Sequence, residues 1–170
     1  MPIRIAVVVG NPKPASRTLN VALATANALA TVVDEAPDRL VVDLATYGPE
    51  LFNLNSERTN RVSAEVAASE LIVVASPTYK ATYTGLLKAF FDRYGNRALE
   101  GRVAVPVMTG ASLVHALASE VHLRPLLVEL GAMTPTRGLY VTEPELADLT
   151  AAVDGWSASA LPEIVRVFHG

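Results

Sequence analysis

Three nearly uninterrupted apolar stretches, over residues 3–9, 71–75 and 103–108, restrict the possible folds of this chain most strongly. A strand that is apolar on both sides is buried on both faces, as happens in parallel sheets covered by helices. Two more apolar stretches, over residues 40–44 and 136–141, bring the predicted strands to five. We therefore expect a sheet enclosed between two layers of helices.

Helical patterns occupy the segments between these strands. Apolar residues recur at spacings of three and four from Leu19 to Ala30 and again from Val114 to Val121, which indicates helices that each cover a face of the sheet. Strictly alternating strands and helices imply right-handed crossovers and a parallel sheet. We predict an α/β fold: a three-layer, doubly wound, five-stranded parallel sheet of the flavodoxin-like type, with strand order 2-1-3-4-5.

Prolines predict two irregular helices. Pro125 removes the donor that would satisfy the carbonyl of Val121, so a kink or a break is expected there. The last helical pattern begins at about Leu146 and contains Gly155 and Pro162, which predict a weak or bent helix.

The length and composition favour one domain over residues 1–170, because 51% hydrophobic residues supply a core for a chain of this size. A net charge of −3 offers no electrostatic footprint for nucleic acid or an anionic membrane surface. The absence of cysteine excludes disulfides and thiolate chemistry and favours a cytoplasmic protein. We recognise neither a signal peptide nor an apolar stretch of roughly 18 residues, so no membrane span is expected.

The segment after the first strand is suited to binding a phosphate. Ser16, Arg17 and Thr18 stand where a helix begins, so hydroxyls, backbone N–H groups and the positive end of the helix dipole would face an anion. Lys13 and Arg17 add positive charge. An ordinary helix N-cap explains the same residues equally well.

The common nucleotide motifs are missing from this segment. It has neither the spacing of a Walker A motif nor the three glycines of the dinucleotide turn. A compact loop rich in Ser and Thr suits a terminal monophosphate, which points to a mononucleotide such as FMN.

Two more strands end in segments of similar character. Pro77, Thr78, Tyr79 and Lys80 follow the third strand and offer a rigid start, a hydroxyl and an aromatic edge beside which a planar ring can lie, although a tyrosine at a strand end is also common in cores. Residues 109–112 follow the fourth strand, where a glycine lets backbone N–H groups approach a ligand, or simply begins a helix. Ligands of open α/β sheets bind outside the carboxyl ends of the strands, so these three segments are expected to converge on one molecule.

Other chemistry is not indicated. His122 and His169 have no companions at metal-ligand spacing, and we predict no metal site. The carboxylates are scattered, so no acid and base pair is predicted. His115 is most simply a surface or packing residue.

Taken together, the three segments resemble those of the NADPH-dependent FMN reductases of the flavodoxin-like superfamily. The resemblance extends from residue 3 to about 141 and is densest over residues 77–88, followed by residues 97–101 and 109–110. Within the family, the chain is most similar to reductases that supply reduced flavin to alkanesulfonate and methanesulfonate monooxygenases.

This resemblance implies roles for particular residues. It assigns the FMN phosphate to the first segment, borders the isoalloxazine ring with the second, and places the third at the pyrimidine end of that ring. The implied cofactor-binding residues are Asn11, Lys13, Ser16, Arg17, Thr18, Pro77, Thr78, Tyr79, Lys80, Thr109, Gly110 and Ala111. His115 matches a histidine often seen in these relatives.

The resemblance also implies an activity. NADPH or NADH would deliver hydride to N5 of FMN, with no catalytic side chain required, and the reduced flavin would pass to a partner monooxygenase. Two alternatives share this fold: a reductase that retains FMN and reduces quinones, azo dyes or metal oxyanions, and a flavodoxin-like electron carrier.

Relatives form homodimers or tetramers through the helices after the second and third segments, and the same is expected here. Those helices carry Leu86, Leu87, Phe90, Phe91, Leu117 and Leu126, which also suit a core.

Overall fold

The computed structural model of the chain describes residues 3–33 and 37–170. The strands are β1 (Arg4–Val9), β2 (Asp38–Asp43), β3 (Leu71–Pro77), β4 (Val103–Gly110) and β5 (Leu139–Thr142). The α-helices are α1 (Arg17–Val33), α2 (Glu57–Ala67), α3 (Gly85–Phe91), α4 (Arg124–Glu129) and α5 (Leu149–His169).

The five strands form one parallel sheet in the order β2-β1-β3-β4-β5. Val7 in β1 is paired with Val41 of β2 on one side and with Val73 of β3 on the other. The predicted fold and strand order are therefore confirmed. Strand order reverses between β1 and β3, which is where a ligand site is expected in such a sheet.

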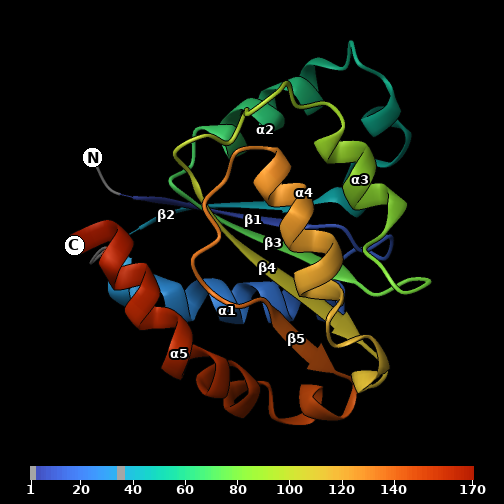
Figure 1. Cartoon of the computed structure of the whole chain (residues 1–170). Helices are drawn as coiled ribbons and strands as arrows, with labels where there is room; N and C mark the ends of the chain where they lie inside the picture. Colours follow the sequence, from blue (N-terminus) through green and yellow to red (C-terminus); the bar gives the residue numbers. More distant parts are fainter. Residues whose placement is uncertain (1–2, 34–36) are drawn as a thin grey trace.

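Helices cover both faces of the sheet (Figure 1). α1 and α5 lie on one face and share a core with it, in which Leu29, Trp156 and Ile164 are buried. α2, α3 and α4 lie on the other face over a second core, which includes Phe90 and Phe91. The sheet thus separates two hydrophobic cores, and its carboxyl edge is left to the loops.

The last strand is shorter than predicted. Residues 136–138 precede β5 because their backbone groups bond to side chains instead of to a neighbouring strand: the carbonyl of Thr136 accepts from Arg124 at 2.6 Å, and the N–H of Gly138 donates to Glu120. β2 occupies residues 38–43, slightly earlier than the predicted 40–44.

The segment after β4 differs most from its prediction. Its apolar residues do not cover the sheet, because Val114, Leu117 and Val121 are 81%, 69% and 55% exposed. Of the predicted apolar face only Ala118 is buried. Instead of a regular helix, the chain makes a 3₁₀ turn over Leu113–His115 and a π-helical turn over Ser119–Leu123 before α4 begins.

The break predicted at Pro125 is present. The N–H of Arg124 bonds to the carbonyl of Ser119, five residues earlier, which widens the helix into the π-turn. Pro125 follows in the first turn of α4, where a missing N–H costs little.

α5 is one continuous helix through Gly155 and Pro162, although these residues predicted a weak or bent one. Trp156 is buried and donates from Nε1 to the carbonyl of Arg137 at 2.9 Å. Tertiary packing of the apolar face therefore outweighs the low helix propensity. Within the described residues, no helix has the length and apolar character needed to cross a bilayer.

Candidate functional site

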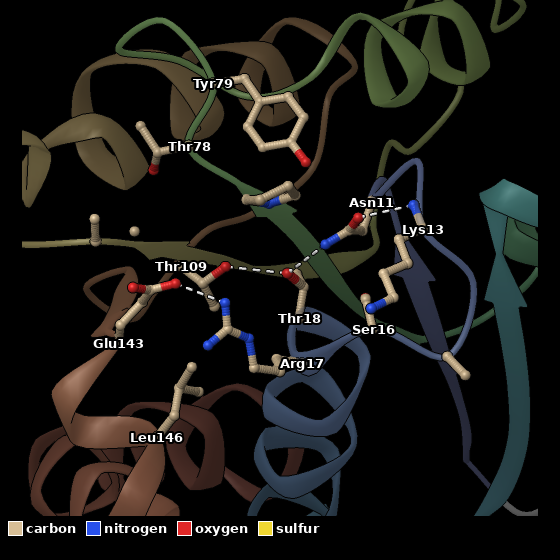
Figure 2. A pocket seen from close by; sticks show the side chains of 14 residues that line it. Asn11, Lys13, Ser16, Arg17, Thr18, Thr78, Tyr79, Thr109, Glu143 and Leu146 are labelled. Carbon is tan, nitrogen blue, oxygen red and sulfur yellow. Dashed lines mark hydrogen bonds and ion pairs between the residues drawn. The ribbon is translucent and has the colours of Figure 1, made fainter.

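A cleft of about 410 Å³ opens at the carboxyl edge of the sheet, where the loops after β1, β3 and β4 meet the turn after β5 (Figure 2). Its volume lies within the range of about 300–1,000 Å³ typical of small-molecule sites. The lining residues are Asn11, Lys13, Ala15, Ser16, Arg17, Thr18, Pro77, Thr78, Tyr79, Thr109, Gly110, Ala111, Glu143 and Leu146.

The loop after β1 aims the start of α1 at the cleft. Ser16 caps the helix, since its hydroxyl accepts from the N–H of Leu19 at 3.2 Å. Ala15 has a positive φ of 51°, and its N–H donates to the carboxylate of Asp43 at 2.9 Å. This contact fixes the turn, and Ser16, Arg17 and Thr18 at the start of α1 line the cleft. The first N–H groups of a helix have no intrahelical partners, so they are available to an anion there.

A chain of polar side chains joins the first loop to the third. The amide nitrogen of Asn11 donates to the hydroxyl of Thr18 at 3.1 Å, and the hydroxyls of Thr18 and Thr109 are 3.0 Å apart (Figure 2). The side-chain oxygen Oδ1 of Asn11 accepts from the backbone N–H of Lys13 at 2.9 Å. The two loops are therefore held in register at the floor of the cleft.

The charged side chains of the lining lie at the α1 end. Arg17 and Lys13 are cationic, and Glu143 is the carboxylate of the turn after β5. Nη2 of Arg17 is 2.6 Å from Oε1 of Glu143 (Figure 2). Within the described part of the chain, no ion pair involves Lys13.

The loop after β3 is a tight hairpin. The N–H of Tyr79 donates to the carbonyl of Thr82 at 2.8 Å, and the reverse bond measures 3.3 Å. The two residues between them, Lys80 and Ala81, both have positive φ, at 51° and 71°. This conformation, which L-residues rarely adopt, presents Tyr79 at the cleft with 51% of its surface exposed.

Thr78 supplies a polar atom that lacks a protein partner. Its N–H donates to the carbonyl of Thr109 at 2.7 Å, which anchors the second loop on the third. Its Oγ1 atom is buried, and no hydrogen-bond partner exists for it among the described residues. Since buried polar groups are normally hydrogen-bonded, this unpartnered hydroxyl makes Thr78 a candidate for contact with a ligand in the cleft.

Glycines permit the close packing around the cleft. A Cβ on Gly110 would lie 1.9 Å from the hydroxyl of Tyr140, which donates to the carbonyl of Ser112 at 3.2 Å. A Cβ on Gly10 would lie 2.5 Å from Cβ of Leu87 in α3. At Gly10 the obstacle is a Cβ atom fixed to the backbone of α3, whereas at Gly110 a side chain would require the end of Tyr140 to move.

The turn after β5 is stabilised by Glu145. Its carboxylate accepts from the N–H of Thr142 at 2.8 Å and from the hydroxyl of the same residue at 2.6 Å. The hydroxyl contact, followed by the backbone contact, lowers the pKa of Glu145. Glu143 within this turn is anchored by its N–H, which donates to the carbonyl of Gly110 at 2.9 Å.

The structure brings all of the predicted binding residues to the cleft lining except Lys80, which lies at the tip of the hairpin. Sequence reasoning missed Ala15, Glu143 and Leu146. Glu143 directly follows β5, so the rule that ligands bind at the carboxyl ends of strands was a signal for it. His115 is exposed and lines a separate shallow hollow.

The donor set of the cleft fits a flavin mononucleotide. Hydroxyls, two cations and a helix N-terminus at one end suit a phosphate. A half-exposed tyrosine, a proline and an unpartnered hydroxyl at the other end suit a planar ring with polar edges. Among the lining residues there is no nucleophile paired with a base, so these side chains are suited to binding and orienting a reactive group.

Comparisons with known proteins agree with this arrangement. An FMN reductase (NADPH) of Escherichia coli strain K12 is 30% identical over 109 residues, which are 62% of this chain and 57% of that protein. The NADH-dependent FMN reductase SfnF of Pseudomonas putida is 31% identical over 152 residues, 82% of this chain and 77% of that one. The apo structure of the NADH:FMN oxidoreductase EMOB superimposes with a TM-score of 0.77 at 26% identity, covering 93% and 90% of the two chains.

The chain spans about half the length of three of the curated relatives that it matches. Residues 3–145 match the family model described as NADPH-dependent FMN reductase. That match covers most of the chain and includes every lining residue of the cleft except Leu146. The chain therefore belongs to the NADPH-dependent FMN reductase family.

Proposed function

We propose that this protein is an NAD(P)H-dependent FMN reductase and that residues 1–170 act as one flavodoxin-like domain. The observation that carries the proposal is the polar division of the cleft: an anion-binding end at the start of α1 and a buried, unpartnered hydroxyl on Thr78 at the opposite wall. The family match and the relatives named as FMN reductases support the same activity.

The phosphate of FMN binds at the first loop in this proposal. Ser16 and the first backbone N–H groups of α1 donate hydrogen bonds, while Lys13 and Arg17 supply charge. Thr18 and Asn11 form the floor of the site, and the hydrogen bond between their side chains fixes their positions before FMN binds. A preformed floor reduces the ordering cost of binding.

The ring binds between the second and third loops. The hydroxyl of Thr78 gains its missing partner at a polar edge of the ring, and Tyr79 covers an exposed part of it. Thr109, Gly110 and Ala111 place donors near the pyrimidine end, where negative charge increases on reduction. FMN, when bound, accepts hydride from NADPH or NADH at its N5 atom, and the protein supplies position and electrostatics.

Oxidation of NADPH and NADH by the purified protein tests the proposal. We expect added FMN to accelerate loss of the nicotinamide absorbance, and the same panel with FAD and a quinone identifies other acceptors. Buffer without protein and protein without FMN are the controls. No acceleration by FMN over buffer would refute the proposal.

We further propose that reduced FMN leaves this cleft to serve a separate flavin-dependent monooxygenase. The exposure of the phosphate end supports this proposal. The side chains of Arg17 and Glu143, which line that end, are 67% and 52% exposed. A purified protein that lacks bound flavin, and that transfers reduced FMN to a monooxygenase through a dialysis membrane, is the expected result. Protein that retains FMN and reduces quinones through it would favour the retained-flavin alternative.

We also propose a homodimer, or a tetramer built from dimers. The predicted contact residues Leu87, Phe90 and Phe91 are buried in the protein's own core, but an apolar row after β4 is exposed. We define the apolar row as Leu113, Val114, Leu117, Val121 and Val128. Five exposed apolar side chains along one segment are suited to a second copy of the chain. A monomeric mass in analytical ultracentrifugation at micromolar concentration would contradict this.

A further inference from the structure

Glu143 places a negative charge at the end of the cleft that is otherwise suited to an anion. Its carboxylate pairs with Arg17 at 2.6 Å, and both side chains line the cleft (Figure 2). Of the two cations in the lining, Arg17 is therefore already paired with a carboxylate, while Lys13 has no ion pair within the described residues. If the only role of Arg17 were to bind phosphate, the carboxylate of Glu143 beside it would have no use.

The position of Glu143 is set by the fold. Its N–H donates to the carbonyl of Gly110, and Glu145, two residues later, locks the turn through Thr142. The backbone that carries the carboxylate is thus tied both to the third loop and to β5. The carboxylate therefore starts from a fixed backbone position beside the phosphate end of the cleft.

We infer that Glu143 is a specificity-determining residue that competes with the flavin phosphate for Arg17 and repels it directly. This inference rests on the proposed function. In the free protein the guanidinium is held by Glu143, and an arriving phosphate must share or displace that contact. The carboxylate therefore weakens binding of a phosphorylated flavin and leaves binding of an unphosphorylated one nearly unchanged. Glu143 thus keeps the dissociation constant of FMN high enough for bound flavin to exchange with free flavin.

The dissociation constants of FMN and riboflavin, measured by quenching of flavin fluorescence, test this inference. We expect Glu143→Gln to bind FMN about three- to fivefold more tightly, the upper part of the range for loss of one exposed charge contact, and riboflavin within about twofold of the wild type. High salt should reduce the difference, since the charges are exposed. In an Arg17→Gln background the gain from Glu143→Gln should be smaller.

Glu163→Gln is the matched control. It removes the carboxylate of another exposed Arg–Glu pair, with Arg166, and makes the same change in net charge far along α5. We expect it to leave both dissociation constants unchanged.

The outcomes separate the two proposals. Wild-type protein that neither binds FMN nor oxidises NAD(P)H with it overturns the proposed function and this inference together. An active wild type whose Glu143→Gln variant binds FMN more weakly, or with unchanged affinity, overturns the inference alone. Equal tightening of FMN and riboflavin also overturns it, because the phosphate would then not be the group that Glu143 senses.

Discussion

In the hairpin after β3, one substitution to glycine is expected to raise the free energy of unfolding, where such substitutions normally lower it. Ala81 has a φ of 71°, and its neighbour Lys80 has a φ of 51°. Two successive positive φ values in a two-residue hairpin loop define a type I′ turn, which favours glycine at its second position. We predict that Ala81→Gly stabilises the protein, although glycine normally destabilises.

The magnitude follows from two opposing effects. An L-residue in the left-handed region costs roughly 1–2 kcal/mol, which glycine removes. Glycine also gains entropy in the unfolded chain, which offsets about 0.4–1 kcal/mol of that relief. We therefore expect a net gain of about 0.5–1 kcal/mol in the free energy of unfolding, or a rise in Tm of about 1–4 °C for a chain of this length.

Urea unfolding followed by circular dichroism measures this effect, with Ala64→Gly as the matched control. Ala64 is an exposed residue in the interior of α2, where the same change should cost about 1 kcal/mol. The two variants should thus move the urea midpoint in opposite directions. If Ala81→Gly destabilises as much as Ala64→Gly, the hairpin does not adopt the left-handed turn and the reasoning is wrong.

Three other substitutions test the site and its surroundings. Gly110→Ala should destabilise by about 1–3 kcal/mol, because the new methyl group must displace the end of the Tyr140 side chain. Adding Tyr140→Phe should recover part of the loss in thermal unfolding, and full stability of the single variant would refute the close packing. Thr78→Val should leave the free energy of unfolding unchanged or raised, because it removes an unpartnered hydroxyl. It should weaken binding of FMN about fivefold or more in a fluorescence titration, and unchanged affinity would show that this hydroxyl does not contact the ligand. Glu120 has a pKa held below 4.5 chiefly by its hydrogen bond with Arg124, so its carboxylate stabilises the folded state above that pH and loses the effect as the pH falls through the lowered value. The stability difference between the wild type and Glu120→Gln should accordingly be largest near neutral pH and vanish in acid, and a difference independent of pH in urea titrations would contradict it.

The sheet could be predicted from the sequence because burial on both faces leaves a direct pattern in β1, β3 and β4. Almost every residue of these strands is buried, so apolar composition alone identifies them. The segment after β4 could not be predicted in this way. Its apolar residues repeat at helical spacing, but this spacing does not reveal whether the apolar face meets the sheet or the surface. Leu117 lies on the surface, and although Pro125 predicts a break, the contacts that Arg124 and Glu120 make with residues 134 and 138 beside the π-turn are tertiary and leave no local pattern.

The candidate site was predictable where its residues stand directly after strands. Thr78 directly follows β3, and Thr109, at the end of β4, is in register with Pro77, so the rule that ligands bind at the carboxyl ends of strands finds both from sequence. Glu143 obeys the same rule but was missed, because a single carboxylate after a short strand carries no motif. The pairing of Glu143 with Arg17 joins residues that are 126 positions apart, and only the fold brings them together.

The sheet stands between the two hydrophobic cores, and this has a consequence for how the cleft responds to change. The phosphate end rests on α1, which belongs to the core shared with α5, while the hairpin with Tyr79 continues from β3 into α3 over the opposite core. Loosening one core should act first on the wall that rests on it, and the hydrogen bonds between the loops pass part of that change to the other wall. Substitutions remote from the ligand can therefore change affinity for the tail of the nucleotide and for its ring to different extents.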